Sequence, residues 1–201
     1  MKFSKFISYF FHPINFPIVG SLIYFLFIPK HIFKTQEYTI LTLILVGSYI
    51  FPLILLIILK YFGMLSSYHM ATVEERKFPA ILFIGISYII GDWLYKSGIV
   101  DLLALFYYGY GVGIAISYIL LHLKIKASLH SLAISGLIGF LICYSYSYQI
   151  NLIYIFIILF ILAGIIASSR LKLKAHTINE IWIGFLLGII SQFIVFGVYI
   201  M

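Results

Sequence analysis

Residues 152–167 read LIYIFIILFILAGIIA, and this stretch decides the class of fold. It contains no charged or amide side chain, so a helix built from it would be apolar on every face. A strand of a transmembrane barrel would instead alternate apolar and polar residues in shorter segments. The stretch therefore predicts a helix that crosses a membrane.

The rest of the chain repeats this pattern. Of its 201 residues, 64% are hydrophobic and only 9% are charged, which is far from the composition of a soluble domain. We predict an all-α, multi-span helical membrane bundle of six to seven transmembrane helices, forming a single domain over residues 1–201. The expected spans are residues 16–28, 38–62, 80–94, 102–123, 131–148, 152–168 and a last one that reaches the C-terminus.

Two of these segments carry additional expectations. Residues 1–13 are expected to form a short interfacial helix, aromatic on one side and lysine-bearing on the other. Residues 16–28 are short for a full crossing and could be re-entrant. Pro52 is expected to bend the second span, because proline interrupts the helical hydrogen bonds.

The charge pattern limits the class of ligand. The net charge is +7, but the cations are scattered over short loops rather than gathered in a domain, which argues against nucleic acid as a partner. Such cations are typical of topology signals, headgroup contacts or phosphate ligands. The single cysteine, Cys143, lies in an apolar run, so the chain has neither a disulfide nor a cysteine-rich metal site.

Three polar stretches interrupt the spans. They read SSYHMATVEERKFP at residues 66–79, KIKASLH at 124–130 and SRLKLKAHTINE at 169–180. Two spans separate each stretch from the next, so all three must emerge on the same side of the membrane. The candidates for one shared polar site are Arg76, Lys126, His130, Arg170, His176 and Glu180, to which His69 could be added.

The third stretch holds the most informative pair. His176 and Glu180 are four residues apart, which on a helix places them on one face. Gly184 and Gly188 continue that face and would let a second helix approach closely. Small residues also recur every four positions in the fifth span, from Ser131, so we expect the fifth and last spans to pack on each other.

The sidedness of the site stays open at this point. Most lysines and arginines lie on the side of the three polar stretches, which would make that side cytoplasmic. Cations that bind an anion would bias the count in the same direction.

These residues resemble the motifs of a known family. The pattern Ser169-Arg170, five residues, His176, three residues, Glu180 resembles the third motif of the type 2 phosphatidic acid phosphatase (PAP2) superfamily, with Glu in place of Asp. The sequence ASLH at 127–130 resembles its second motif, with Leu129 in place of glycine, and ERKFP at 75–79 resembles its first. Together with FHP at 11–13, the chain is similar to small PAP2-like membrane proteins of Bacteroidetes.

The resemblance implies a phosphatase that needs no metal or other cofactor. It implies that His176 attacks phosphorus to form a phosphohistidine, that Glu180 orients this imidazole and that His130 protonates the leaving oxygen. Arg170, Ser128 and Arg76 would bind the phosphate. Lys126 is our own addition to this set, as a substitute for the lysine that the first motif lacks here.

The predicted function is hydrolysis of a lipid phosphate or diphosphate in a membrane, with the bacterial inner membrane as the expected location. Two alternatives remain open. One is a PAP2-like protein that binds or transports a lipid phosphate without cleaving it, which the altered first and second motifs would explain. The other is a haem or quinone protein that uses His122, His130 and His176 as ligands.

Overall fold

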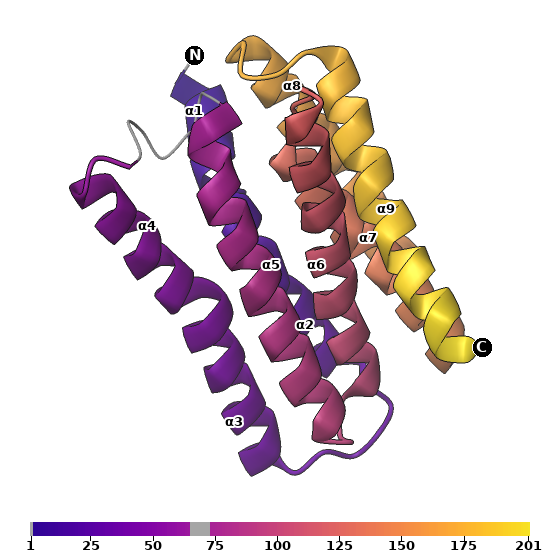
Figure 1. Cartoon of the computed structure of the whole chain (residues 1–201). Helices are drawn as coiled ribbons and strands as arrows, with labels where there is room; N and C mark the ends of the chain where they lie inside the picture. Colours follow the sequence, from indigo (N-terminus) through magenta and orange to yellow (C-terminus); the bar gives the residue numbers. More distant parts are fainter. Residues whose placement is uncertain (1, 65–72) are drawn as a thin grey trace.

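The computed structural model describes residues 2–64 and 73–201. Within them, seven helical segments are long and apolar enough to cross a membrane. This confirms the prediction of a multi-span helical membrane bundle (Figure 1). The elements are α1 (Lys2–Phe10), η1 (Pro13–Asn15), α2 (Phe16–Phe27), α3 (Lys34–Leu45), η2 (Val46–Ile50), α4 (Phe51–Tyr61), α5 (Val73–Lys96), α6 (Asp101–His122), α7 (Leu129–Tyr148), α8 (Ile153–Lys172) and α9 (Ile178–Ile200).

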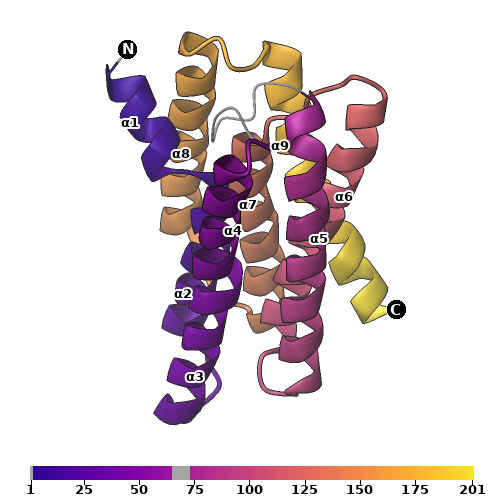
Figure 2. The same ribbon diagram turned by 60° about the vertical axis from the view of Figure 1, so that its left-hand side comes forward.

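The first candidate span joins three elements. It runs over Lys2–Phe27 and includes α1, the single turn η1 and α2. Its continuity is broken at Pro13, which starts η1 and whose ring has no N–H for a helical bond to α1. Figure 2 shows α1 inclined away from α2 and lying beside α8.

Helix α5 begins earlier than the sequence indicated. The expected start was residue 80, whereas the helix runs over Val73–Lys96 and contains Pro79. Proline removes the one hydrogen bond that its N–H would give to the carbonyl of residue 75. That carbonyl lies in the first turn of the helix, so the helix continues and Arg76 belongs to α5 rather than to a loop. His69 lies outside the described residues.

The second span contains a π-helix close to Pro52, the residue at which the sequence predicted a bend. Five residues, Val46–Ile50, form η2 immediately before the proline-containing start of α4. A π-turn adds one residue to the helical turn and so rotates the side chains that follow it about the helix axis. Ser48 lies in η2 and donates its hydroxyl to the Ile44 carbonyl at 2.7 Å.

Helix α7 forms the centre of the bundle, and the expected packing between the fifth and last spans is confirmed. Most of its side chains are buried, and it contacts α9, α6, α8 and α2. The two glycines that α9 presents to it leave no space for a side chain. A Cβ on Gly188 would collide with the Ser135 hydroxyl and the Leu132 carbonyl, and one on Gly184 would collide with the Ser128 carbonyl.

Helix α6 also uses glycine for close packing. It runs without a break over Asp101–His122, so its GYGVG sequence does not interrupt it. Gly109 faces the Gln192 side chain and Gly113 faces Ser191, both on α9. The amide of Gln192 donates to the Phe106 carbonyl at 3.1 Å.

The polar stretches meet at one end of the bundle, as their spacing predicted. The start of α5, the connection from α6 to α7 and the connection from α8 to α9 lie at the same end, together with α1 (Figures 1 and 2). The candidate site residues of these segments are thus brought to a single membrane face.

Candidate functional site

His176 occupies the turn that opens α9. Thr177 caps the helix: its hydroxyl accepts the Glu180 N–H at 3.3 Å, and the Glu180 carboxylate accepts the Thr177 N–H at 3.2 Å. His176 precedes this cap, so the expectation that His176 and Glu180 lie on one helical face is wrong. The capping box nevertheless brings them together, because it turns the Glu180 carboxylate back toward the residues before the helix.

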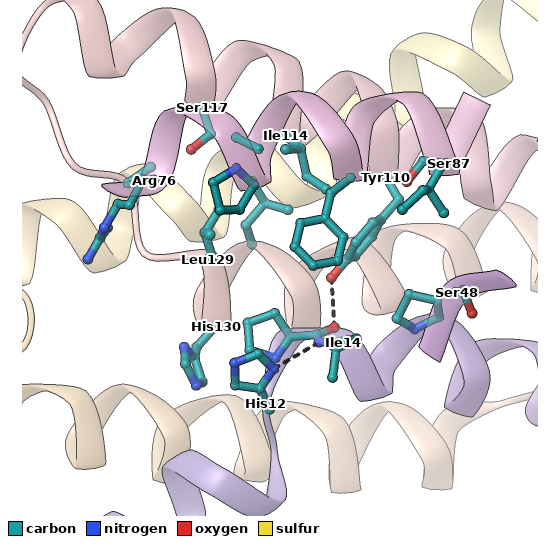
Figure 3. A pocket seen from close by; sticks show the side chains of 18 of the residues that line it. His12, Ile14, Ser48, Arg76, Ser87, Tyr110, Ile114, Ser117, Leu129 and His130 are labelled. Atoms are coloured by element: carbon teal, nitrogen blue, oxygen red, sulfur yellow. Dashed lines mark hydrogen bonds between the residues drawn. The ribbon is translucent and has the colours of Figure 1, made fainter. Parts of the chain in front are cut away.

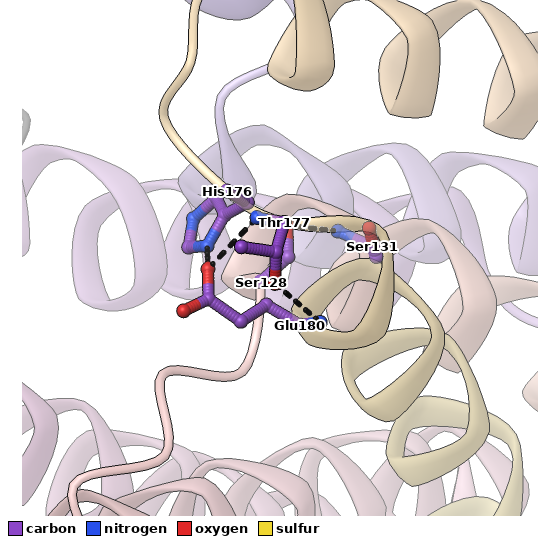
Figure 4. A network of polar contacts seen from close by, with 5 residues as sticks. All are labelled: Ser128, Ser131, His176, Thr177 and Glu180. Carbon is purple, nitrogen blue, oxygen red and sulfur yellow. Dashed lines mark hydrogen bonds and ion pairs between the residues drawn. The ribbon is translucent and has the colours of Figure 1, made fainter.

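The contact with Glu180 sets the state of the imidazole. Nδ1 of His176 lies 2.8 Å from Oε2 of Glu180 (Figure 4). A carboxylate only accepts hydrogen bonds, so Nδ1 carries the proton and the neutral ring keeps its lone pair on Nε2. Burial lowers the pKa of His176 to about 4. The charges of Arg76 and Arg170 also lower this pKa, whereas Glu180 raises it. His176 is therefore neutral at physiological pH, with the lone pair of Nε2 not used by Glu180.

Two buried guanidinium groups lie close to this imidazole. Arg170, near the end of α8, is 4% exposed, and Arg76, in the first turn of α5, is 9% exposed. Nη1 of Arg170 donates to the Ser8 hydroxyl at 2.6 Å, whereas its Nε–H has no acceptor among the described residues. A buried, charged donor without an acceptor is costly, so an anion at this position would satisfy it.

His130 lies in the first turn of α7 and points toward α1. Its Nε2 lies 3.1 Å from the carbonyl oxygen of Ser8, which can only accept, so Nε2 carries a proton. The ring of His12 packs edge-on against it, with 5.7 Å between the two centroids. His12 in turn accepts the Ile14 N–H on Nδ1 at 3.4 Å.

The N-terminal segment thus supplies two residues that the sequence analysis did not assign to the site. Ser8 contacts both Arg170 and His130, and the sequence contains no signal for it, since a serine in an amphipathic helix is unremarkable. His12 belongs to the FHP stretch, whose only signal in the sequence is the family resemblance.

Ser128 and Lys126 have different positions from those expected of phosphate ligands. Ser128 is fully buried and caps α7: its hydroxyl accepts the Ser131 N–H at 3.4 Å, and its own N–H donates to the Glu180 carbonyl at 2.9 Å. It therefore joins the start of α7 to the start of α9. Lys126 is half-buried. Neither residue belongs to the lining of the cavity described next.

A cavity of about 100 Å³ extends from this site into the bundle. The charged or imidazole side chains at its mouth are those of His12, Arg76, His130, Arg170 and His176. In Figure 3, Arg76 and His130 lie toward one end, Ser48 and Ser87 lie toward the other, and Ile14, Tyr110 and Ile114 lie between them. The phosphatase prediction requires the imidazoles of His130 and His176 to face one common space. Both residues line this cavity.

The alternative of a histidine-ligated cofactor has less geometric support. His122 is exposed at the end of α6, stacked edge-on against Tyr118, and does not line the cavity. Among residues 2–64 and 73–201, no cluster of three His, Cys, Asp or Glu side chains is arranged to hold a metal ion. The three histidines proposed as ligands therefore do not converge.

Comparison with protein families, with characterised proteins and with solved structures gives no match for this chain.

Proposed function

We propose that the chain is an integral-membrane phosphatase that hydrolyses a lipid phosphate or diphosphate through a phosphohistidine on His176. One observation carries the proposal. A neutral imidazole, held in one tautomer by a carboxylate, lies beside two buried guanidinium groups, one of which has an unused N–H. Phosphoryl transfer requires a nucleophile and fixed positive charge around the phosphoryl oxygens, and both are present here.

The first step forms the covalent intermediate. The lone pair on Nε2 of His176 attacks phosphorus, an N–P bond forms, and the P–O bond to the lipid breaks with its electron pair leaving on oxygen. The ring gains positive charge in this step, which Glu180 stabilises through Nδ1–H. Arg170 and Arg76 neutralise the charge on the phosphoryl oxygens.

The leaving oxygen needs a proton. A lipid phosphate monoanion brings one, and His130, which lines the cavity, would relay it. In the structure the Nε2–H of His130 is donated to the Ser8 carbonyl, so the leaving oxygen would have to replace that carbonyl as acceptor. Water then attacks phosphorus, the N–P bond breaks and inorganic phosphate is released with neutral His176.

A lipid is the preferred substrate because of the position of the site. The phosphate groups of membrane lipids lie where the spans end, and no separate soluble domain is present among the described residues to recruit a polar substrate. The bacterial inner membrane is the location that we propose with this activity.

The test is phosphate release from a panel of lipid phosphates by the purified protein in detergent. We expect phosphate release by the wild type and none by His176→Ala. In the wild type, the phosphohistidine on His176 should be detected by mass spectrometry in alkali. His122→Ala is the matched control, because it removes an exposed imidazole outside the cavity. Binding of lipid phosphate without release would favour the non-catalytic alternative, and release that survives His176→Ala would refute the mechanism.

A further inference from the structure

A second pocket lies on the outside of the bundle, between α1 and α8. Its volume is about 310 Å³, and α1 contributes Phe3 and Ser4 to its lining. The other lining residues recur every three or four positions along one face of α8: Ile161, Gly164, Ile165, Ser168, Ser169 and Lys172. Figure 2 shows α1 beside α8. No residue of this pocket lines the cavity at His176, so the pocket is separate from the proposed site.

The lining of the pocket changes from polar to apolar along α8. Lys172, Ser169 and Ser168 lie at the end of the helix, on the membrane face that carries the polar stretches. Ile165 and Ile161 lie deeper, and Ile161 is 11 residues before Lys172, or about 16 Å along a helix. The hydrocarbon of one leaflet is about 15 Å thick. The pocket therefore begins at the level of the lipid headgroups and ends within one leaflet.

Two serine hydroxyls in this pocket lack a partner. Ser4 is 5% exposed and Ser169 is 3% exposed, and neither hydroxyl has a hydrogen-bond partner among the described residues. Other buried helical serines, such as Ser21 and Ser48, donate to the carbonyl four residues earlier. A buried hydroxyl without a partner is costly, so a ligand with acceptor oxygens would satisfy both serines.

The polar end of the pocket is also cationic. Lys172 is exposed at its rim, and neither α1 nor α8 contains an acidic residue that could neutralise this charge. Hydroxyl and ammonium donors around one space match the acceptor oxygens of a phosphate group. The expected ligand therefore carries a phosphate at headgroup level and apolar groups below it.

The volume fits the polar part of a phospholipid. A cavity of about 150 Å³ holds one benzene ring, so about 310 Å³ has room for about twice as many atoms, and glycerol phosphate has about ten non-hydrogen atoms. The acyl chains need no enclosed space, because Ile161 is 60% exposed and a Cβ on Gly164 would meet no atom within 4 Å. We propose that this pocket binds one anionic phospholipid, with its glycerol phosphate at Ser4, Ser169 and Lys172 and its acyl chains on the apolar face of α8. This lipid is a bound ligand and not the substrate, so the inference does not rest on the proposed function.

The bound lipid would join the two helices that meet at the proposed site. Ser4 and Ser8 are one turn apart on α1, and Ser8 accepts the hydrogen bond from Arg170, the residue after Ser169. A lipid held by both Ser4 and Ser169 therefore restrains α1 in the position that the contact between Ser8 and Arg170 requires.

Native mass spectrometry of the delipidated protein, with dioleoylphosphatidylglycerol added in detergent, tests the proposal. We expect one lipid to be retained per chain. Gly164→Leu places a side chain in the apolar half of the pocket and should abolish this retention. Gly85→Leu is the matched control, because a Cβ on Gly85 also meets no atom within 4 Å but lies on α5, outside the pocket.

Lys172→Gln tests the polar end without adding bulk. One lysine near a lipid surface contributes about fivefold to the affinity for an anionic lipid, so the Kd should rise by about that factor. Lys174→Gln removes an exposed charge outside the pocket and should change the Kd by less than about twofold. Dioleoylphosphatidylcholine has the phosphate but no net charge, and it should bind the wild type more weakly than dioleoylphosphatidylglycerol does.

Three results would overturn the proposal. The first is a wild type that retains no lipid, and the second is equal retention by Gly164→Leu and Gly85→Leu. The third is a lipid-free dimer that Gly164→Leu disrupts, because a second copy of the chain would then occupy the pocket. An affinity that ignores both Lys172→Gln and the headgroup charge would refute the anionic lipid. None of these measurements involves phosphate release, so they succeed or fail independently of the phosphatase proposal.

Discussion

The pKa of His176 offers a direct test of the site, because it reports burial, the carboxylate contact and the two arginines at once. The structure places this pKa at about 4, against about 6.5 for an ordinary histidine. At pH 5.5 only about 3% of His176 should be protonated, whereas an ordinary histidine would be about 90% protonated.

Histidine-labelled protein in detergent allows this titration to be followed by NMR, with the His176 signal assigned from the spectrum of His176→Ala. Arg76→Gln should raise the pKa, because the charge of Arg76 acts to lower it. Glu180→Gln should lower it further, because the carboxylate acts to raise it. Lys77→Gln removes a charge at the next position of α5 and is the matched control for Arg76→Gln.

The same difference in pKa has a consequence for stability. The folded protein keeps His176 neutral in a pH range where the unfolded chain binds a proton. The free energy of unfolding should therefore be unaffected by His176 above about pH 6.5 and should fall by about 3 kcal/mol as the pH is lowered to 4. A His176 midpoint at or above 6.5, or one that Arg76→Gln leaves unchanged, would refute the assignment of a neutral nucleophile beside buried cations.

Three further predictions concern individual contacts. Glu180→Gln keeps an oxygen for the Thr177 cap but loses the carboxylate, so the rate of phosphate release should fall by about 10²- to 10⁴-fold with folding intact. A loss of less than about twofold would contradict the proposed role of Glu180. Gly188→Ala should lower the free energy of unfolding by about 1–3 kcal/mol, because its Cβ meets the Ser135 hydroxyl. Gly197→Ala faces open space and should raise the free energy of unfolding by up to about 1 kcal/mol. Equal thermal denaturation of the two variants would disprove the packing of α9 on α7. Ser8→Ala removes the acceptor of a buried Arg170 N–H and should lower the free energy of unfolding by about 1–3 kcal/mol, part of which added phosphate should restore. A melting temperature equal to that of the wild type would show that this contact contributes nothing to stability.

The bundle was predictable because its signals are local. A run such as that of α8 must be a membrane helix whatever its neighbours are, since no face of it can meet water. The recurrence of Gly184 and Gly188 marks a face where only backbone can fit, and the partner helix was correctly expected from its own small residues. Counting spans then placed Arg76, His130 and His176 at one membrane face without any knowledge of packing.

What escaped prediction depends on contacts between distant segments or on local competition between helix and cap. The role of Ser8 exists only because α1 folds back beside α8, and an amphipathic pattern does not say against what a helix will lie. Ser128 has the expected position in sequence, but its hydroxyl is used by the backbone of Ser131. The spacing of His176 and Glu180 indicated that both belong to the helix. Thr177 instead caps α9, so His176 lies before the helix begins.

The contacts of Ser8 have a consequence for how the protein is made. Its partner His130 lies 122 residues further along the chain, and its partner Arg170 lies 162 residues further. During translation α1 is therefore made long before either partner is available to it. Until α8 and α9 are made, Arg76 has neither Arg170 nor the Glu180 carboxylate nearby, so this centre cannot assemble before α9 exists.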